Sequence, residues 1–158
     1  MQPNPKIELL LVSLDQTEQF GKLLGSLCEP GDIICLNGDL GAGKTTLTQS
    51  IAKGMGVDAK EYITSPTFAV LHQYNGRLQL YHMDFYRLRN SDDVLAMGLD
   101  EYFYLGGVTV IEWYLNAFDI IPEDHLLLEL EIVGEQSRRI RCTSNSETWR
   151  QRIERLTS

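Results

Sequence analysis

Residues 38–45 read Gly38-Asp39-Leu40-Gly41-Ala42-Gly43-Lys44-Thr45, and they follow directly on the apolar stretch 32–37, Asp-Ile-Ile-Cys-Leu-Asn. A short, continuously apolar run of this kind is typical of a strand buried in a parallel sheet. Lys44–Met55 has the pattern of a helix, and the glycines at 54 and 56 mark its end. Strand, glycine-rich loop and helix are the context in which the pattern Gly-x-x-x-x-Gly-Lys-Thr binds phosphate groups. This stretch therefore predicts a nucleotide-binding phosphate loop.

Each residue type in the predicted loop has a part in phosphate binding. Glycines let the backbone turn its N–H groups toward the nucleotide, and the positive end of the helix dipole favours the phosphates. Lys44 is expected to reach the outer phosphates, and the Thr45 hydroxyl to bind Mg²⁺. A glycine-rich surface turn is the alternative, but the strand before the loop and the helix after it disfavour that interpretation. The predicted nucleotide-binding residues of the loop are Gly38, Asp39, Leu40, Gly41, Ala42, Gly43, Lys44, Thr45 and Thr46.

Two acidic residues end apolar strand-like segments elsewhere in the chain. Asp84 follows Leu78–Met83, and Glu112 follows Val108–Ile111. In an open α/β sheet, the carboxyl ends of the strands face the ligand crevice, and Mg²⁺ beside a nucleotide needs further oxygen ligands. We therefore predict Thr45, Asp84 and Glu112 as metal ligands, and Lys44, Asp84 and Glu112 as the catalytic residues. The chain contains no Asn-Lys-x-Asp run to read a guanine ring, so ATP is favoured as the nucleotide.

The flanking segments predict an α/β fold. Asn75-Gly76 is a strong hairpin signal between the strand-like segments Phe68–Tyr74 and Arg77–Met83. The architecture expected is that of a P-loop NTPase, with a central, largely parallel sheet, added antiparallel hairpins and helices on both faces. The other predicted elements are strands at Lys6–Ser13, Val108–Ile111, His125–Val133 and Arg138–Thr143, and helices at Asp15–Cys28, Ser91–Gly98 and Glu147–Leu156.

Composition and charge limit the classes of function. A chain of 158 residues without a linker or repeat predicts a single ATPase domain over 1–158. The formal net charge of −8 disfavours direct, independent binding of nucleic acid, which normally requires a positive face. No apolar run is long enough for a membrane span and no secretory signal is recognisable, so a cytoplasmic protein is expected. The three cysteines are widely spaced and are predicted to be core thiols.

Three further features have more than one interpretation. Ser65-Pro66-Thr67 lies between the phosphate-loop helix and the first hairpin, where it is either a turn or a switch segment that senses the γ-phosphate. Trp113 follows Glu112 and is either a core aromatic or part of the site. The histidines lack the spacing of a metal site, and the role of His82 stays open.

The combination of these motifs resembles the bacterial TsaE family, small P-loop ATPases of the tRNA threonylcarbamoyladenosine pathway. The resemblance rests on Gly38–Thr46, Ser65-Pro66-Thr67, His82-x-Asp84-x-Tyr86-Arg87 and Ile111-Glu112-Trp113, in this order and spacing. It covers roughly 12–122 well and the C-terminal hairpin and helix loosely. It implies ATP and Mg²⁺ as cofactors and the proteins TsaB and TsaD as partners, which transfer the threonylcarbamoyl group to adenosine 37 of tRNAs reading codons that begin with A. Contact with tRNA would be indirect, through the complex.

The resemblance also implies two nucleotide-holding positions outside the loop, Thr17 near the first helix and Arg138 on the late hairpin. The function expected is thus an ATPase that drives or resets a tRNA-modifying complex without carrying out the group transfer. A small-molecule kinase with the same loop is the alternative, with Arg87 and Arg89 as lid arginines. A nucleotide-gated binding module without relevant hydrolysis is a third possibility.

Overall fold

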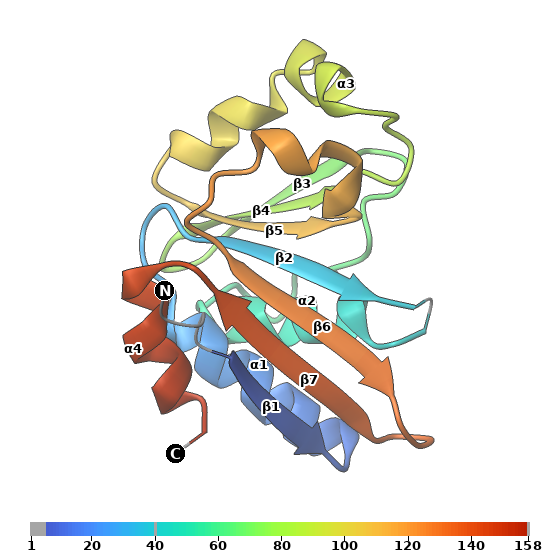
Figure 1. The fold of residues 1–158 in the computed structure, drawn as a ribbon, viewed down its shortest axis with the longest axis vertical. Helices are drawn as coiled ribbons and strands as arrows, with labels where there is room; N and C mark the ends of the chain where they lie inside the picture. The colour runs from blue at the N-terminus through green and yellow to red at the C-terminus, as the bar shows by residue number, and fades with distance from the viewer. Residues whose placement is uncertain (1–5, 40, 158) are drawn as a thin grey trace.

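This computed structural model describes residues 6–39 and 41–157. Within them, seven strands form a single sheet (Figure 1). The order of strands across the sheet is β1-β7-β6-β2-β5-β4-β3. The strands are β1 Lys6–Leu11, β2 Ile33–Gly38, β3 Leu71–Asn75, β4 Gln79–Asp84, β5 Val108–Glu112, β6 Leu126–Ile132 and β7 Arg138–Ser144.

The centre of the sheet is parallel and its edges are antiparallel. β6, β2, β5 and β4 are neighbours that all pair in the parallel sense. β7 and β1 extend this centre on one side as antiparallel strands, and β3 does so on the other. All five residues of β5 and the first four of β2 are buried, because these strands are covered on both faces. The predicted α/β architecture is confirmed.

Helices cover both faces of the sheet, as predicted (Figure 1). α1 (Leu14–Leu27), α2 (Lys44–Gly54) and α4 (Glu147–Arg155) pack on one apolar core. α3 (Ser91–Ala96) and two 3₁₀ segments, Leu99–Tyr104 and Tyr114–Ile120, pack on a second core across the sheet. The two 3₁₀ segments are missing from the sequence prediction, since they are too short to show a helical period.

α1 and α2 approach each other so closely that glycine is required at the contact. A Cβ added to Gly25 would lie 2.1 Å from the Ile51 carbonyl oxygen, and one added to Gly54 would lie 2.1 Å from that of Lys22. A side chain at either position would push the helices apart. The contact fixes α2 on the sheet and, with it, the helix terminus that follows the phosphate loop.

The first hairpin differs from its prediction in two respects. β3 begins at Leu71 rather than Phe68, because Val70 has a φ of +69° and its N–H bonds to the Pro66 carbonyl in a turn. The loop comprises residues 76–78 rather than a two-residue Asn-Gly turn. Gly76 is needed there for another reason: a Cβ would lie 2.7 Å from the Met55 carbonyl oxygen, at the end of α2.

The cysteines are core thiols, as predicted. Cys28, Cys35 and Cys142 are all buried and free. Burial raises the pKa of each thiol from 9.0 to about 12, so all three are protonated at neutral pH. They are therefore weak nucleophiles that pack in the core, and Cys28 also donates a hydrogen bond to the Leu24 carbonyl oxygen.

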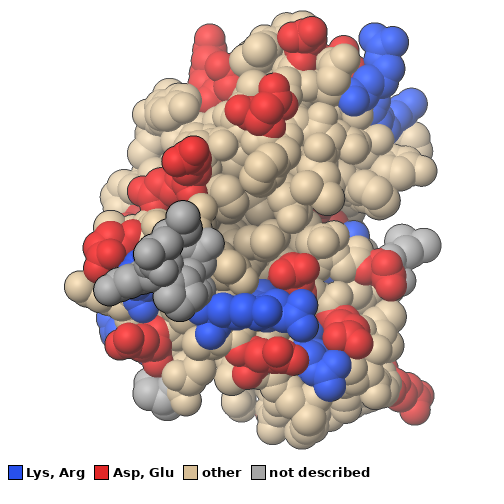
Figure 2. Space-filling view, in the orientation of Figure 1, with Lys and Arg blue, Asp and Glu red and all other residues tan. Residues whose placement is uncertain are grey.

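The open face of β1, β7 and β6 carries opposite charges in contact. Figure 2 shows a band of basic side chains over these strands with acidic side chains on either side of it. Arg139 lies 3.1 Å from Glu8 and 3.0 Å from Glu131, and Arg141 lies 3.8 Å from Glu8. Two arginines of the basic band are therefore paired with carboxylates. In the described part of the chain, no helix is long and apolar enough to cross a membrane.

Candidate functional site

The phosphate loop joins β2 to α2 through glycines in a left-handed conformation. Gly41 and Gly43 have φ values of +81° and +102°, which residues with a Cβ rarely adopt. Gly43 immediately precedes α2 and offers no side chain to cap it. The N–H groups of the first helical turn therefore have no partner within the helix, an arrangement that can bind an anion. Leu40, a predicted loop residue, lies outside the described residues.

Lys44 lies across the mouth of the loop, between its backbone and an aromatic ring. Its Nζ donates a hydrogen bond to the Gly38 carbonyl oxygen over 2.8 Å. The same nitrogen is 5.3 Å from the centre of the Trp113 ring, within range of a cation–π contact. The ammonium group is thus held at the cleft by contacts that a phosphate can replace.

The two predicted acids lie side by side. Asp84 and Glu112 are the last residues of the parallel neighbours β4 and β5, and they are direct partners in the register. Their exposed fractions are 2% and 3%. Since parallel strands end at one edge of the sheet, the two carboxylates meet where the phosphate loop also ends. The fold thus brings together two carboxylates that are 28 positions apart in the sequence.

Ser65 and Thr67 reach these acids from the segment between α2 and β3. Ser65 Oγ is 2.9 Å from Asp84 Oδ2 and 3.4 Å from Glu112 Oε2. Thr67 Oγ1 donates to the same Asp84 oxygen over 3.1 Å, and the backbone N–H of Tyr86 holds Oδ1 over 2.8 Å. The hydroxyls thus make Ser65–Thr67 part of the site, whereas its function as a switch stays a prediction.

Trp113 has the strained backbone that often accompanies function. Its φ is +58°, a left-handed value that is rare outside glycine, asparagine and aspartate. The residue is 47% exposed, and its ring lies 4.9 Å, centre to centre, from that of Tyr86. Trp113 is therefore a surface aromatic at the cleft and not a core residue.

These groups line one cleft of about 410 Å³. Its walls are Gly41, Gly43, Lys44, Thr45, Thr46, Ser65, Thr67, Asp84, Glu112 and Trp113. Hydroxyl and carboxylate oxygens are the ligands that Mg²⁺ prefers. Within the described residues, no group of three or more His, Cys, Asp or Glu side chains can hold a metal by itself. Mg²⁺ that is bound through one or two carboxylates and nucleotide phosphates needs no such group, so Thr45, Asp84 and Glu112 fit this ion.

Thr17 and Arg138 lie together on the far side of the loop. With Gly43, Thr46 and the β6–β7 turn, they line a pocket of about 140 Å³. Arg138 Nε donates to the Ala42 carbonyl oxygen over 2.8 Å, and its Nη1 donates to Gly134 and Ser137 of the turn over 3.1 and 2.9 Å. The side chain therefore ties the turn to the phosphate loop, a contact across 96 positions that sequence reasoning missed.

A sequence model of one family matches residues 11–140, which is most of the chain. Its description is "Threonylcarbamoyl adenosine biosynthesis protein TsaE". The chain belongs to the TsaE family. The resemblance noted from the sequence motifs is confirmed, and the family places the protein in tRNA threonylcarbamoyladenosine biosynthesis.

Individual TsaE proteins support this membership over nearly the whole chain. The TsaE protein of Bacillus subtilis is 38% identical over 92% of this chain and 90% of its own length. That of Treponema pallidum is 41% identical over 81% of this chain and 93% of its own length. The crystal structure of Bacillus subtilis YdiB superposes with a TM-score of 0.82 at 34% identity, covering 99% of this chain and 97% of YdiB.

Proposed function

We propose that this TsaE-family protein is a Mg²⁺-dependent ATPase of one domain, spanning residues 1–158. It acts with TsaD and TsaB in forming the threonylcarbamoyl group on adenosine 37 of tRNAs that read codons beginning with A. The observation that carries the proposal is the cleft in which Lys44 and the open terminus of α2 face the paired carboxylates Asp84 and Glu112. A phosphate-binding loop opposite two buried acids is the arrangement that nucleotide hydrolysis requires.

We assign phosphate binding, metal binding and the orientation of water to different residues of the cleft. The first-turn N–H groups of α2 and the Lys44 ammonium bind the phosphates. Thr45 and Asp84 would hold Mg²⁺, and the bound ion would neutralise charge on the phosphates and fix their orientation. Glu112 orients the attacking water or a water in the metal shell, because its carboxylate lies at the same end of the sheet.

The pocket on the far side of the loop receives the rest of the nucleotide. Thr17 is 3% exposed and lies beside Gly43 and Thr46, and Arg138 closes the pocket from the β6–β7 turn. The phosphates in the loop and the adenosine in this pocket would then lie on opposite sides of Gly43. The backbone of Asp39 and Ala42 forms part of the loop that would separate the phosphates from the adenosine.

The accessory role is supported by charge as well as by family. The chain has a net charge of −8, and Arg139 and Arg141 on the open sheet face are paired with carboxylates. A subunit that grips tRNA through its phosphates needs unpaired positive charge. We therefore assign tRNA contact to the partners and the ATP cycle to this protein.

Reconstitution tests the function directly. TsaD, TsaB, unmodified tRNA and the threonylcarbamoyl donor are incubated with MgATP, with and without this protein, and modified adenosine is measured together with released phosphate. We expect the protein to be required for repeated rounds and Lys44→Ala to abolish this effect. Lys53→Ala is the matched control, since Lys53 is an exposed lysine on the same helix. Modification that proceeds equally without the protein would refute the proposal.

The same assay separates hydrolysis from phosphoryl transfer to a small molecule. A second cleft of about 380 Å³ lies on the Trp113–Asn116 side of Lys44 and has room for an acceptor. With γ-labelled ATP, label in inorganic phosphate supports the ATPase. Label in a small-molecule fraction from the source cell would support a kinase instead.

A further inference from the structure

His82 is a fully buried histidine in direct contact with the candidate site. It lies on β4 two residues before Asp84, so the two side chains share the sheet face that α2 covers. Its register partner on β5 is Val110, two residues before Glu112. The imidazole reaches diagonally past Val110, and its Nε2 lies 2.8 Å from Glu112 Oε2. The exposed fractions of the two side chains are 0% and 4%.

The other ring nitrogen shows which form of the ring this site holds. Nδ1 of His82 is buried and has no hydrogen-bond partner among the described residues. A proton on Nδ1 would be a buried N–H donor without an acceptor, whereas a bare Nδ1 leaves only a lone pair. The geometry therefore favours a ring that carries its proton on Nε2 and donates it to Glu112.

An unpaired buried nitrogen is an unusual feature in a strand and calls for an explanation. Packing alone would be served by an aliphatic side chain, such as those at Leu80 and Val110 on the same face. What the imidazole adds is a rigid donor aimed at one carboxylate oxygen. Ser65 Oγ approaches the same oxygen, so Oε1 is the oxygen of Glu112 that the described hydrogen bonds leave unused.

We propose that His82 is a positioning residue for Glu112. Its Nε2–H holds Oε2 and thereby turns Oε1 toward the cleft, where this oxygen would accept a hydrogen bond from the attacking water or from a water of the metal shell. This inference rests on the proposed ATPase function and assigns no contact between His82 and the nucleotide itself. With His82 in place, Oε2 of Glu112 anchors the carboxylate in the fold, and Oε1 is free to take part in the reaction.

Two substitutions separate the donor from the volume of the ring. His82→Gln places an amide nitrogen near the position of Nε2, and His82→Leu fills the space without a donor. Thr109→Val is the matched control, since Thr109 is a buried polar residue of β5 whose hydroxyl has no partner among the described residues. For each variant, kcat and KM for MgATP, the dissociation constant for ADP and the unfolding midpoint are measured.

We expect His82→Leu to lower kcat by about 10–100-fold, as is usual when the partner that orients a functional carboxylate is lost. KM and ADP affinity should change little. His82→Gln should recover most of the lost kcat, and Thr109→Val should resemble the wild type. A purely structural role predicts lower unfolding midpoints with an unchanged kcat per folded molecule, and that result would overturn the proposal.

A double-mutant cycle tests whether the histidine acts through Glu112. In the Glu112→Gln background, His82→Leu should reduce kcat no further, because the group that it positions is already gone. Independent, multiplicative losses would overturn the proposal. If the wild type neither binds nor hydrolyses ATP, the ATPase function itself is wrong, and this outcome is distinct from a wild-type rate that His82→Leu leaves unchanged.

The ligand-free protein provides a readout that does not depend on turnover. Long-range ¹⁵N–¹H NMR correlations of the histidine rings distinguish the Nε2–H from the Nδ1–H form, and His82→Gln identifies the signal. We expect the Nε2–H form, with a shift of this signal in Glu112→Gln. An Nδ1–H form would overturn the proposal, since Nε2 would then have no proton to donate. The measurement also decides the question if His82→Leu does not fold.

Discussion

Ser65 Oγ lies 2.9 Å from Asp84 Oδ2, although the two residues are 19 positions apart and come from a loop and the end of a central strand. Thr67 donates to the same oxygen. The hydroxyls of Ser65 and Thr67 therefore both bind the carboxylate that we assign to the metal. Because a metal ion on Asp84 would compete with these hydrogen bonds, we predict that Ser65–Thr67 acts as a switch segment that rearranges when Mg²⁺ and nucleotide bind.

Loss of the loop lysine should strongly weaken nucleotide binding. Lys44→Ala removes the only cationic side chain among the described residues of the cleft. Hydrogen bonds to charged groups contribute about 1.5–3 kcal/mol, so we expect affinity for an ATP analogue to fall by roughly 10–100-fold. Isothermal titration calorimetry measures this, with Lys53→Ala as the exposed control on the same helix. Equal affinities for Lys44→Ala and the control would refute the loop assignment.

Loss of the metal carboxylate should affect only the magnesium form of the nucleotide. Asp84→Asn keeps the size of the side chain but removes its charge, so affinity for MgADP should fall by about tenfold or more while affinity for ADP in EDTA changes little. Competition with a fluorescent nucleotide, with and without Mg²⁺, measures both values. Asp92→Asn, at an exposed aspartate of α3, is the control. If both nucleotide forms weaken equally, Asp84 is not in the metal shell.

Trp113 should report nucleotide binding by fluorescence. Its ring contacts Lys44, and this contact changes when the ammonium turns to a phosphate. The other tryptophan, Trp149, is 1% exposed and stacks on Arg152 with 3.7 Å between the guanidinium carbon and the ring centre. We therefore expect Trp113→Phe to remove the nucleotide-induced change and Trp149→Phe to retain it. If Trp113→Phe retained the change and Trp149→Phe removed it, the end of β5 would not lie at the nucleotide.

Much of the fold is predictable because its signals are local. The apolar run before Gly38 and the glycines of the loop determine a strand, a turn and a helix within a few residues of one another. Asp84 and Glu112 are predictable as a pair for the same reason, since each ends a recognisable strand. The β3 boundary was wrong because Val70 adopts a left-handed conformation, and a β-branched residue gives no sequence signal for this.

The contacts that complete the site are non-local, and no pattern in the sequence specifies them. Arg138 reaches Ala42 across 96 positions, and His82 reaches Glu112 across 30. Each depends on strand order, which places β7 beside β6 and β4 beside β5. The fold class restricts that order without determining it. A histidine two residues before a strand-end acid is the one local clue to the second contact.

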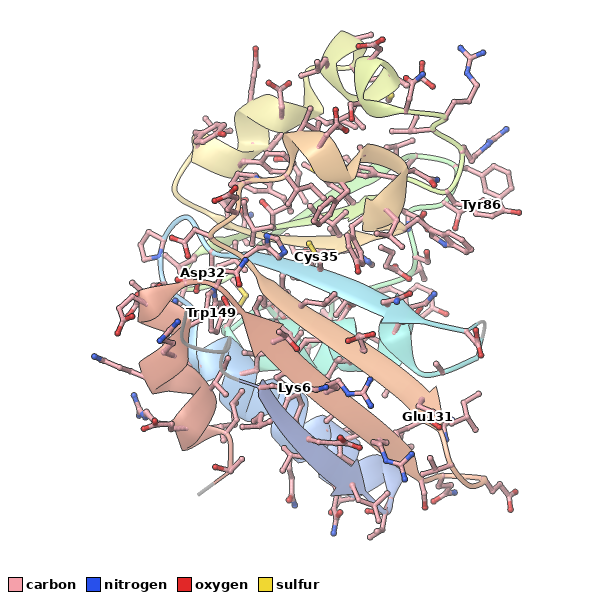
Figure 3. The ribbon with its side chains drawn as sticks, in the orientation of Figure 1. Lys6, Asp32, Cys35, Tyr86, Glu131 and Trp149 are labelled. Carbon is pink, nitrogen blue, oxygen red and sulfur yellow. The ribbon has the colours of Figure 1, made fainter. Side chains whose placement is uncertain are left out.

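The ion pair that holds α4 should dominate the stability of the C-terminal region. Arg152 donates to both carboxylate oxygens of Asp32, over 2.6 and 3.0 Å, and both residues are nearly buried. Arg152 also lies over the ring of Trp149, and Figure 3 labels Asp32 and Trp149 in this region. Arg152→Leu leaves the Asp32 carboxylate buried without its counter-charge, so we expect a loss of about 3–5 kcal/mol in the free energy of unfolding.

Urea denaturation of the ion-pair variants measures this loss. Arg89→Ala is the control, because Arg89 is 87% exposed in its pair with Asp93, and it should change stability much less. The double variant Asp32→Asn/Arg152→Leu should be more stable than Arg152→Leu alone, since no unpaired charge remains. A single variant as stable as the wild type would show that the pair does not hold α4.

The last prediction is that the isolated protein hydrolyses ATP slowly and that its partners accelerate the reaction. Lys44 is the one lysine or arginine among the described residues that line the cleft, and the guanidinium of Arg138 is occupied by loop and turn carbonyls. Where no second cation stabilises the transferred phosphoryl group, a cation supplied in trans can raise the rate by about 10³–10⁵-fold. We therefore expect phosphate release to rise strongly on addition of TsaD and TsaB.

Thr67→Val, which removes one hydroxyl from Asp84, should reduce this stimulation more than the basal rate, because it uncouples the loop from the site. Thr64→Val, one position outside Ser65–Thr67, is the control, and fast turnover that the partners leave unchanged would contradict the prediction.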